Sequence, residues 1–189
     1  GRNKYFNCTG FEVVAAAPWT AVSVTPLASG ADYDCRLHEP ITGSDDESGF
    51  GPFLAWSYRD AGQIDALIFR PTPPATSQTL DVGVLNINDA TSDYDFSRST
   101  SATTLTAASS FTLTLAAGEL LRLYELSLGP LAAGGVDVTL NDFGTDSGVH
   151  VSWVPASVTA AGLSDLTTAV VDAAGRCTLE IDAPGSGSH

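Results

Sequence analysis

The chain has 189 residues, of which 43% are hydrophobic, and this composition excludes a disordered polypeptide. Acidic residues outnumber basic residues 22 to 8, which gives a formal net charge of −14. This charge excludes nucleic acids and anionic membrane surfaces as partners, because both require a basic face. No apolar run reaches the roughly 18 residues that a membrane-spanning helix needs, so we expect no membrane insertion.

Alternation of apolar with polar residues predicts β-strands along most of the chain. The expected strands cover residues 20–25, 64–70, 80–84, 111–115, 120–128, 136–140, 149–153 and 177–181. Only residues 160–174 have apolar residues near helical spacing, and the threonines and valines in this stretch weaken a helix. The pattern therefore predicts an all-β protein with at most one short helix.

Stretches rich in Ser, Thr and Pro suggest where the chain divides. Residues 71–79 are rich in Pro and Thr, and residues 97–110 are rich in Ser, Thr and Ala. We predict two tandem antiparallel β-sandwich domains of jelly-roll type, residues 1–96 and 97–189. One continuous sandwich is the alternative.

The first half of the chain carries a family resemblance. A hydrophobic segment at residues 11–14 and an alternating strand at 20–25 precede Asp32-Tyr33-Asp34-Cys35-Arg36-Leu37, which has a D-x-D-x-x-L pattern. Residues 80–87 approximate a closing G-x-Y-x-L-x-V strand. Together these segments resemble bacterial pre-peptidase C-terminal type domains. The resemblance implies a secreted accessory or surface module of jelly-roll type without catalytic residues of its own.

Three cysteines occur without the close Cys and His spacings that zinc requires. We predict a disulfide between Cys8 and Cys35, which would contribute about 3 kcal/mol by closing a loop. Cys177 is then left over, either buried or bonded to another chain, and three reduced cysteines are the alternative. The sequon Asn7-Cys8-Thr9 makes Asn7 a candidate glycosylation site.

The segment from Asn88 to Asp95 offers three carboxylates, those of Asp89, Asp93 and Asp95. Calcium binds six to eight hard oxygen ligands, so these three aspartates are candidate calcium ligands, and we expect no other cofactor. The competing hypothesis is ordinary turn chemistry, in which Asn and Asp side chains bond their own backbone.

No arrangement of residues predicts catalysis. The segment Gly144-Thr145-Asp146-Ser147-Gly148 does not fit the G-x-S-x-G nucleophile elbow, and we expect no enzymatic activity. Five aromatic residues are candidates for a sugar-binding face, and two of them, Trp56 and Tyr58, lie on one face of a strand because they are two positions apart. The candidates are Trp19, Trp56, Tyr58, Tyr124 and Trp153.

These features predict a non-catalytic, extracellular or cell-surface protein. The first hypothesis is a structural subunit that polymerises with copies of itself into a fibre or layer through sheet edges, with residues 5–14 donated as a terminal strand. The alternative is a monomeric module that binds carbohydrate or calcium within a larger secreted bacterial protein.

Overall fold

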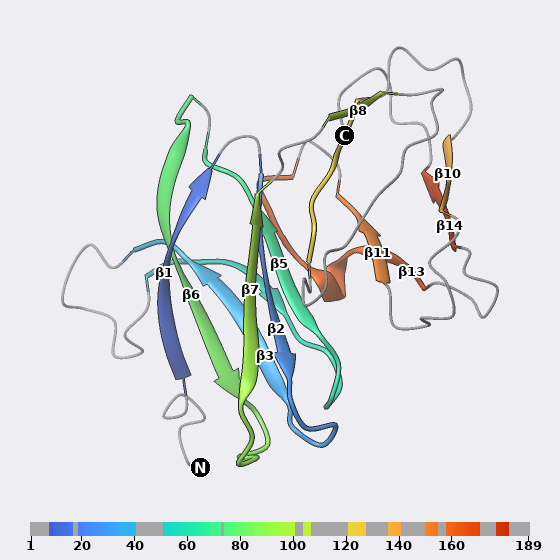
Figure 1. Cartoon of the computed structure of the whole chain (residues 1–189). Coiled ribbons are helices and arrows are strands. Elements are labelled where there is room, and N and C mark those ends of the chain that lie inside the picture. Colours follow the sequence, from blue (N-terminus) through green and yellow to red (C-terminus); the bar gives the residue numbers. More distant parts are fainter. Residues whose placement is uncertain are drawn as a thin grey trace. The chain divides into compact units, whose positions relative to one another are not determined.

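The computed structural model describes residues 8–16, 19–40, 51–72, 74–100, 104–106, 121–127, 136–140, 150–154, 158–170 and 177–181. The chain forms two compact units (Figure 1). The larger unit comprises Gly1–Thr103, Thr112–Tyr124 and Val158–Asp165, and the remaining residues form the smaller unit. The predicted boundary after residue 96 falls inside a strand of the larger unit, β7 (Tyr94–Thr100).

One antiparallel sheet of the larger unit has the strand order β1-β6-β3-β4 (Figure 1). Its strands are β1 (Cys8–Ala16), β6 (Ser77–Asn86), β3 (Tyr33–His38) and β4 (Phe53–Ser57). Strand β6, the longest of the four, pairs with β1 over residues 77–85 and with β3 over residues 81–86. The N-terminal segment predicted to complete a neighbour's sheet therefore pairs within its own chain, over residues 8–16.

The second antiparallel sheet has the order β12-β5-β2-β7. It is built from β5 (Asp65–Phe69) and β2 (Thr20–Pro26), with β12 (Ala160–Gly162) and β7 (Tyr94–Thr100) at its edges. The Ser and Thr residues 97–100 belong to β7 and pair with β2, although their composition resembles that of a linker. Pairing with a buried neighbour strand determines their structure more strongly than composition does.

The core lies between these two sheets, because its buried residues come from both. Core residues that share a strand lie two positions apart, as expected for side chains on one face of a sheet. The first sheet contributes Val13, Ala15, Tyr33, Cys35, Leu37, Ala55, Leu80, Val82 and Val84, and the second contributes Val22, Val24, Leu67 and Phe69. The larger unit is therefore a β-sandwich, and the all-β prediction is confirmed.

The described strands of the smaller unit form short pairs. Two pairs are antiparallel: β10 (Val136–Leu140) with β14 (Cys177–Ile181), and β11 (His150–Trp153) with β13 (Thr167–Val170). The third pair, β8 (Thr104–Thr106) with β9 (Glu125–Ser127), is parallel. The strand predicted at residues 111–115 lies outside the described residues.

The segment with helical spacing does not form an α-helix over its described part, residues 160–170. It forms strand β12, one turn of 3-10 helix, η2 (Leu163–Asp165), and strand β13. The prediction of at most one short helix is therefore consistent with the described residues, in which η2 is a single turn. β-branched residues such as Thr167, Thr168 and Val170 favour extended backbone once a partner strand is available.

Residues near the start of this segment, Gly162 and Ser164, also cover the edge of strand β4. Gly162 approaches the β4 backbone so closely that a Cβ atom there would lie well under 3.0 Å from the Trp56 carbonyl oxygen. The Ser164 hydroxyl accepts a hydrogen bond from the Tyr58 amide at 3.3 Å and donates one to the Trp56 carbonyl at 3.4 Å. These contacts satisfy edge groups of β4 that would otherwise be open to another strand.

We predict that Gly162→Ala lowers the free energy of unfolding by about 1–3 kcal/mol, because the new methyl group must displace backbone atoms of β4. Urea denaturation measures the change. The matched control is Gly30→Ala, where the new methyl group has no neighbour within 4 Å, so its stability should stay within about 0.5 kcal/mol of the parent. Equal stability of both variants would contradict the close approach of β12 to β4.

Candidate functional site

Two aromatic side chains lie together on the face of β4 that points away from the core. Trp56 alternates with the buried residues Ala55 and Ser57, and Tyr58 directly follows the strand. The ring centroids of Trp56 and Tyr58 are 4.9 Å apart, with an interplanar angle of 55°. Their predicted placement on one face is therefore confirmed. Tyr58 is 52% exposed. We call this pair the aromatic face.

Strand β3 holds the indole of Trp56 in place. Arg36 is the register partner of Trp56, and its guanidinium carbon lies 4.3 Å from the centroid of the indole ring. The Trp56 Nε1–H donates a hydrogen bond to the Asp34 carboxylate at 3.3 Å. A cation over the ring and an acceptor at its polar edge together orient the indole.

Strand β4 also carries two further exposed apolar side chains. Phe53 is 55% exposed and Leu54 is 38% exposed. The ring of His38 meets that of Phe53 edge to face at 5.8 Å, and the His38 Nδ1 lies 2.8 Å from the Gly51 carbonyl oxygen. Large apolar side chains gathered on one exposed strand are typical of a binding surface.

A buried polar group lies on the core side of the same strand. Ser57 Oγ donates a hydrogen bond to the Asp65 carboxylate of β5 at 2.5 Å and accepts one from the Ala66 amide at 3.3 Å. Asp65 is only 1% exposed. This serine and this aspartate therefore connect β4 in one sheet with β5 in the other.

The pKa of Asp65 is raised from 3.8 to about 7, chiefly by burial and also by the nearby Asp34 carboxylate, which together outweigh the lowering effects of the Ser57 hydrogen bond and of Arg59. Burial also raises the pKa of the Cys35 thiol well above its usual range, with Asp65 and Asp34 adding to the effect. Cys35 is therefore a neutral thiol, which is the unreactive form.

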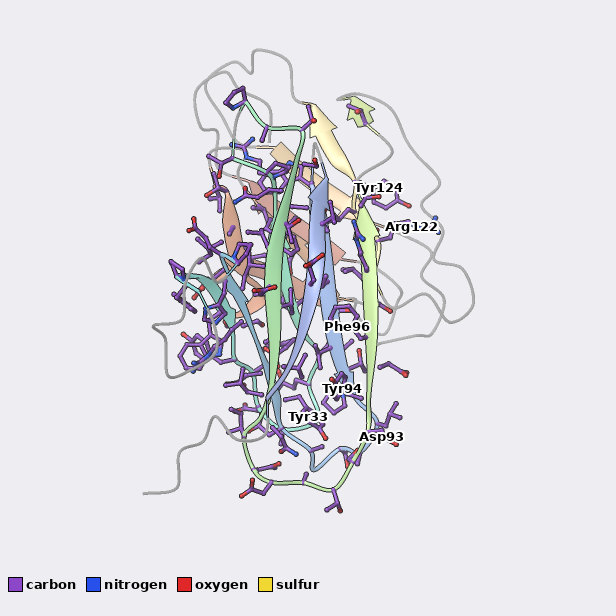
Figure 2. All side chains as sticks on the ribbon, turned by 90° about the vertical axis from the view of Figure 1, so that its left-hand side faces the viewer. Tyr33, Asp93, Tyr94, Phe96, Arg122 and Tyr124 are labelled. Carbon is purple, nitrogen blue, oxygen red and sulfur yellow. The ribbon has the colours of Figure 1, made fainter. Side chains whose placement is uncertain are left out.

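The structure does not bring the three predicted calcium ligands together. Asp89 lies in the loop before β7, and Asp95 lies within that strand opposite Thr25. Asp93, which is labelled in Figure 2, immediately precedes the strand. Among the described residues, no group of three or more His, Cys, Asp or Glu side chains is placed to hold a metal ion. The described geometry gives the calcium hypothesis no support.

The same loop shows the turn chemistry of the competing hypothesis. The Asn88 side chain accepts hydrogen bonds from the Asp32 and Ala90 amides, each at 3.3 Å, and donates one to the Gly30 carbonyl at 2.7 Å. Asn86 donates to the Ala90 carbonyl at 2.7 Å. Asp89 has a φ of 57°, a left-handed conformation that Asp and Asn adopt more readily than most residues.

Tyrosines pack at this end of the sandwich as well. The rings of Tyr33 and Tyr94 are 5.1 Å apart, and the Tyr33 hydroxyl donates a hydrogen bond to the Ser92 carbonyl (Figure 2). The Leu27 amide donates to the Asp93 carbonyl at 3.0 Å. The loop from residue 86 to residue 93 is thus ordered by hydrogen bonds and ring packing from its own chain.

The predicted disulfide between Cys8 and Cys35 is not formed, and this prediction is corrected: Cys35 is a free, buried thiol. Cys8 pairs with Leu85 and Cys35 pairs with Val84, so strand β6 lies between the two cysteines. Two strand spacings amount to about 9.5 Å, which exceeds the Cα separation that a disulfide tolerates. Asn7, the candidate glycosylation site, lies outside the described residues.

Two other aromatic candidates, Trp19 and Tyr124, do not join the aromatic face. Trp19 is buried, and the guanidinium of Arg70 lies 5.0 Å from its ring centroid. Tyr124 is partly buried and lies beside the upper end of β7, near Arg122 (Figure 2). The side chain of Trp153 lies outside the described part of the structure. Alternation in the sequence identified Trp56 and Tyr58, whereas Asp34 and Arg36 were noted only within the D-x-D-x-x-L pattern and no sequence signal pointed to Asp65.

Comparison with known proteins finds no family model, no curated protein and no solved structure that matches this chain. The part of the chain that the structure describes contains no helix with the length and hydropathy of a membrane span. The chemistry of the aromatic face is therefore the basis for the function proposed below.

We predict that Asn88→Ala lowers the free energy of unfolding by about 1 kcal/mol, because three hydrogen bonds of the loop lose their partner. The change is measured by thermal and urea denaturation with and without calcium chloride. We expect calcium to leave the Tm of the parent protein unchanged. A rise in Tm with calcium that disappears in Asp89→Asn or Asp93→Asn would instead support the calcium site.

Proposed function

We propose that this protein is a non-catalytic extracellular binding module that receives a glycan ring on the aromatic face. The observation that carries the proposal is the half-exposed Tyr58 ring, which lies against a Trp56 indole fixed by Asp34 and Arg36. A fixed aromatic ring costs little conformational entropy when it binds a ligand.

Sugar chemistry suits this surface. A pyranose ring presents apolar C–H groups on its faces and hydroxyl groups at its rim. The Tyr58 ring provides an apolar surface with a polar tip, and the Arg36 guanidinium provides donors next to the indole. A surface with an apolar body and a few polar groups is typical of a binding site for such a ligand.

The net charge narrows the class of glycan. A chain with a formal charge of −14 repels polyanionic polysaccharides over distances of about 10 Å at moderate ionic strength. Neutral polysaccharides avoid this penalty. We therefore propose neutral glycans as the ligand class.

Self-assembly into a fibre or layer is the second candidate function. The exposed Phe53 and Leu54 beside the aromatic face support it, because a contiguous apolar surface also suits contact with a second copy of the chain. Because β1 pairs within its own sheet, support for self-assembly comes from this surface and not from donation of a terminal strand. Both candidate functions use the outer surface of β4. The partner bound there is a glycan in the first and a second copy of the chain in the second.

We predict that Tyr58→Ala lowers affinity for neutral polysaccharides at least tenfold, because the exposed stacking surface is removed, while stability changes by less than about 0.5 kcal/mol. Binding is measured on an array of neutral and acidic polysaccharides. The matched control is Leu27→Ala, which removes a side chain that is also exposed but lies away from β4.

Size-exclusion chromatography over a range of protein concentrations separates the two candidates. A concentration-dependent oligomer that Leu54→Ala dissociates, together with no binding on the array, would favour self-assembly. A monomer that binds neutral polysaccharides, with binding lost in Tyr58→Ala, would favour the glycan module.

A further inference from the structure

Strand β4 presents the aromatic face on one side and a buried hydrogen bond on the other. Ser57 lies between Trp56 and Tyr58 in sequence, so its side chain points in the opposite direction, towards the core. Its hydroxyl group bridges the Asp65 carboxylate and the Ala66 amide. Any change in this bridge acts on the strand that positions both aromatic rings.

Groups from several elements surround Asp65, and burial together with the Asp34 carboxylate favours its neutral form over the opposing effects of Ser57 and Arg59. Strand β3 contributes the Asp34 carboxylate and the Cys35 thiol, and the loop before β5 contributes Arg59. Strand β2 places Val24 opposite Asp65, and β2 contains no titratable residue. The acidic residue of η2, Asp165, is exposed to solvent. The Arg59 guanidinium donates to the Ile64 carbonyl at 3.2 Å.

We propose that the Ser57–Asp65 pair is a pH-sensitive link between the two sheets and that it regulates the aromatic face on β4. The link itself stands on the geometry of the buried pair. Its effect on ligand binding rests on the proposed function.

The direction of the effect follows from proton linkage. The pKa of Asp65 is raised in the folded state. Between about pH 4 and pH 7 the folded protein therefore holds a proton on Asp65 that the unfolded or locally opened chain has already released. The free energy of opening is therefore greatest below about pH 4, falls as the pH rises towards about 7, and is constant above that pH. Above about pH 7 the folded protein holds a carboxylate in the core, and opening of β4 lets water reach it.

Hydrogen exchange of single amides tests the link directly. The Ala66 amide, which donates to Ser57, and the Tyr58 amide, which donates to Ser164, report on opening at β4 and β5. After correction for intrinsic exchange rates, we expect their opening equilibrium in the parent protein to rise by up to about tenfold per pH unit between pH 4.5 and 6.5. In Asp65→Asn this rise should be lost.

The matched control is Asp95→Asn, which removes an exposed carboxylate of β7 and should keep the pH dependence of the parent. The same pH dependence in the parent and in Asp65→Asn would overturn the proposal. If Asp65→Asn does not fold, Ser57→Ala replaces it. Loss of a hydrogen bond that stabilises the carboxylate should move the midpoint of the transition to higher pH, and an unchanged midpoint would overturn the proposal.

Binding to the neutral polysaccharide selected on the array supplies the second measurement. We expect affinity to fall from pH 5 to pH 8 in the parent protein and to vary less in Asp65→Asn. Absence of binding at every pH would overturn the proposed function and leave the hydrogen-exchange result to decide on the link. Binding that is independent of pH, with exchange that depends on pH, would overturn the regulation of the aromatic face.

Discussion

The hydrogen bond from Ser57 to the buried Asp65 is the interaction on which the candidate site depends. It joins β4 to β5, and therefore one sheet to the other, directly behind Trp56 and Tyr58. A carboxyl group in a core costs free energy unless it is neutral or hydrogen-bonded, and here the donor comes from the strand that carries the aromatic residues. The register of β4 against β3 thus places Ser57 on the core side, where it reaches Asp65, and Trp56 on the opposite side, next to Arg36.

Contacts from other strands and loops cover edge strands on both sides of the sandwich. At one side, Gly162 and the Ser164 hydroxyl cover backbone atoms of β4. At the other, the Arg98 guanidinium of β7 donates to the Val14 carbonyl of β1 at 2.6 Å. Contacts of this kind reduce the tendency of a sheet edge to pair with another chain. What remains accessible on β4 is its outward side-chain surface, and side chains select partners by shape and chemistry.

The carboxylates of the chain lie in two kinds of surroundings. Carboxylates such as Asp89 and Asp93 lie in loops, where water solvates them and neighbouring asparagines order the backbone. Asp34 and Asp65 are exceptions, because both are buried next to the residues of the aromatic face. Local departures from the rule that charged groups stay exposed are characteristic of functional positions.

Local sequence was sufficient to predict the all-β class, the positions of β2, β5, β6, β10, β11 and β14, and the shared face of Trp56 and Tyr58, because alternation with period two is a local property. It failed at β7, whose Ser and Thr residues are strand residues only because β2 pairs with them. It also failed for the Cys8–Cys35 disulfide, since only the strand order shows that β6 separates the two cysteines.

The acidic net charge and the strand periodicity belong to the sequence alone. The burial of Asp65, the stacking of Arg36 on Trp56 and the closure of β4 by a segment more than 100 residues away belong to the tertiary structure. These features depend on strand order and register, which are set by contacts between residues distant in the chain.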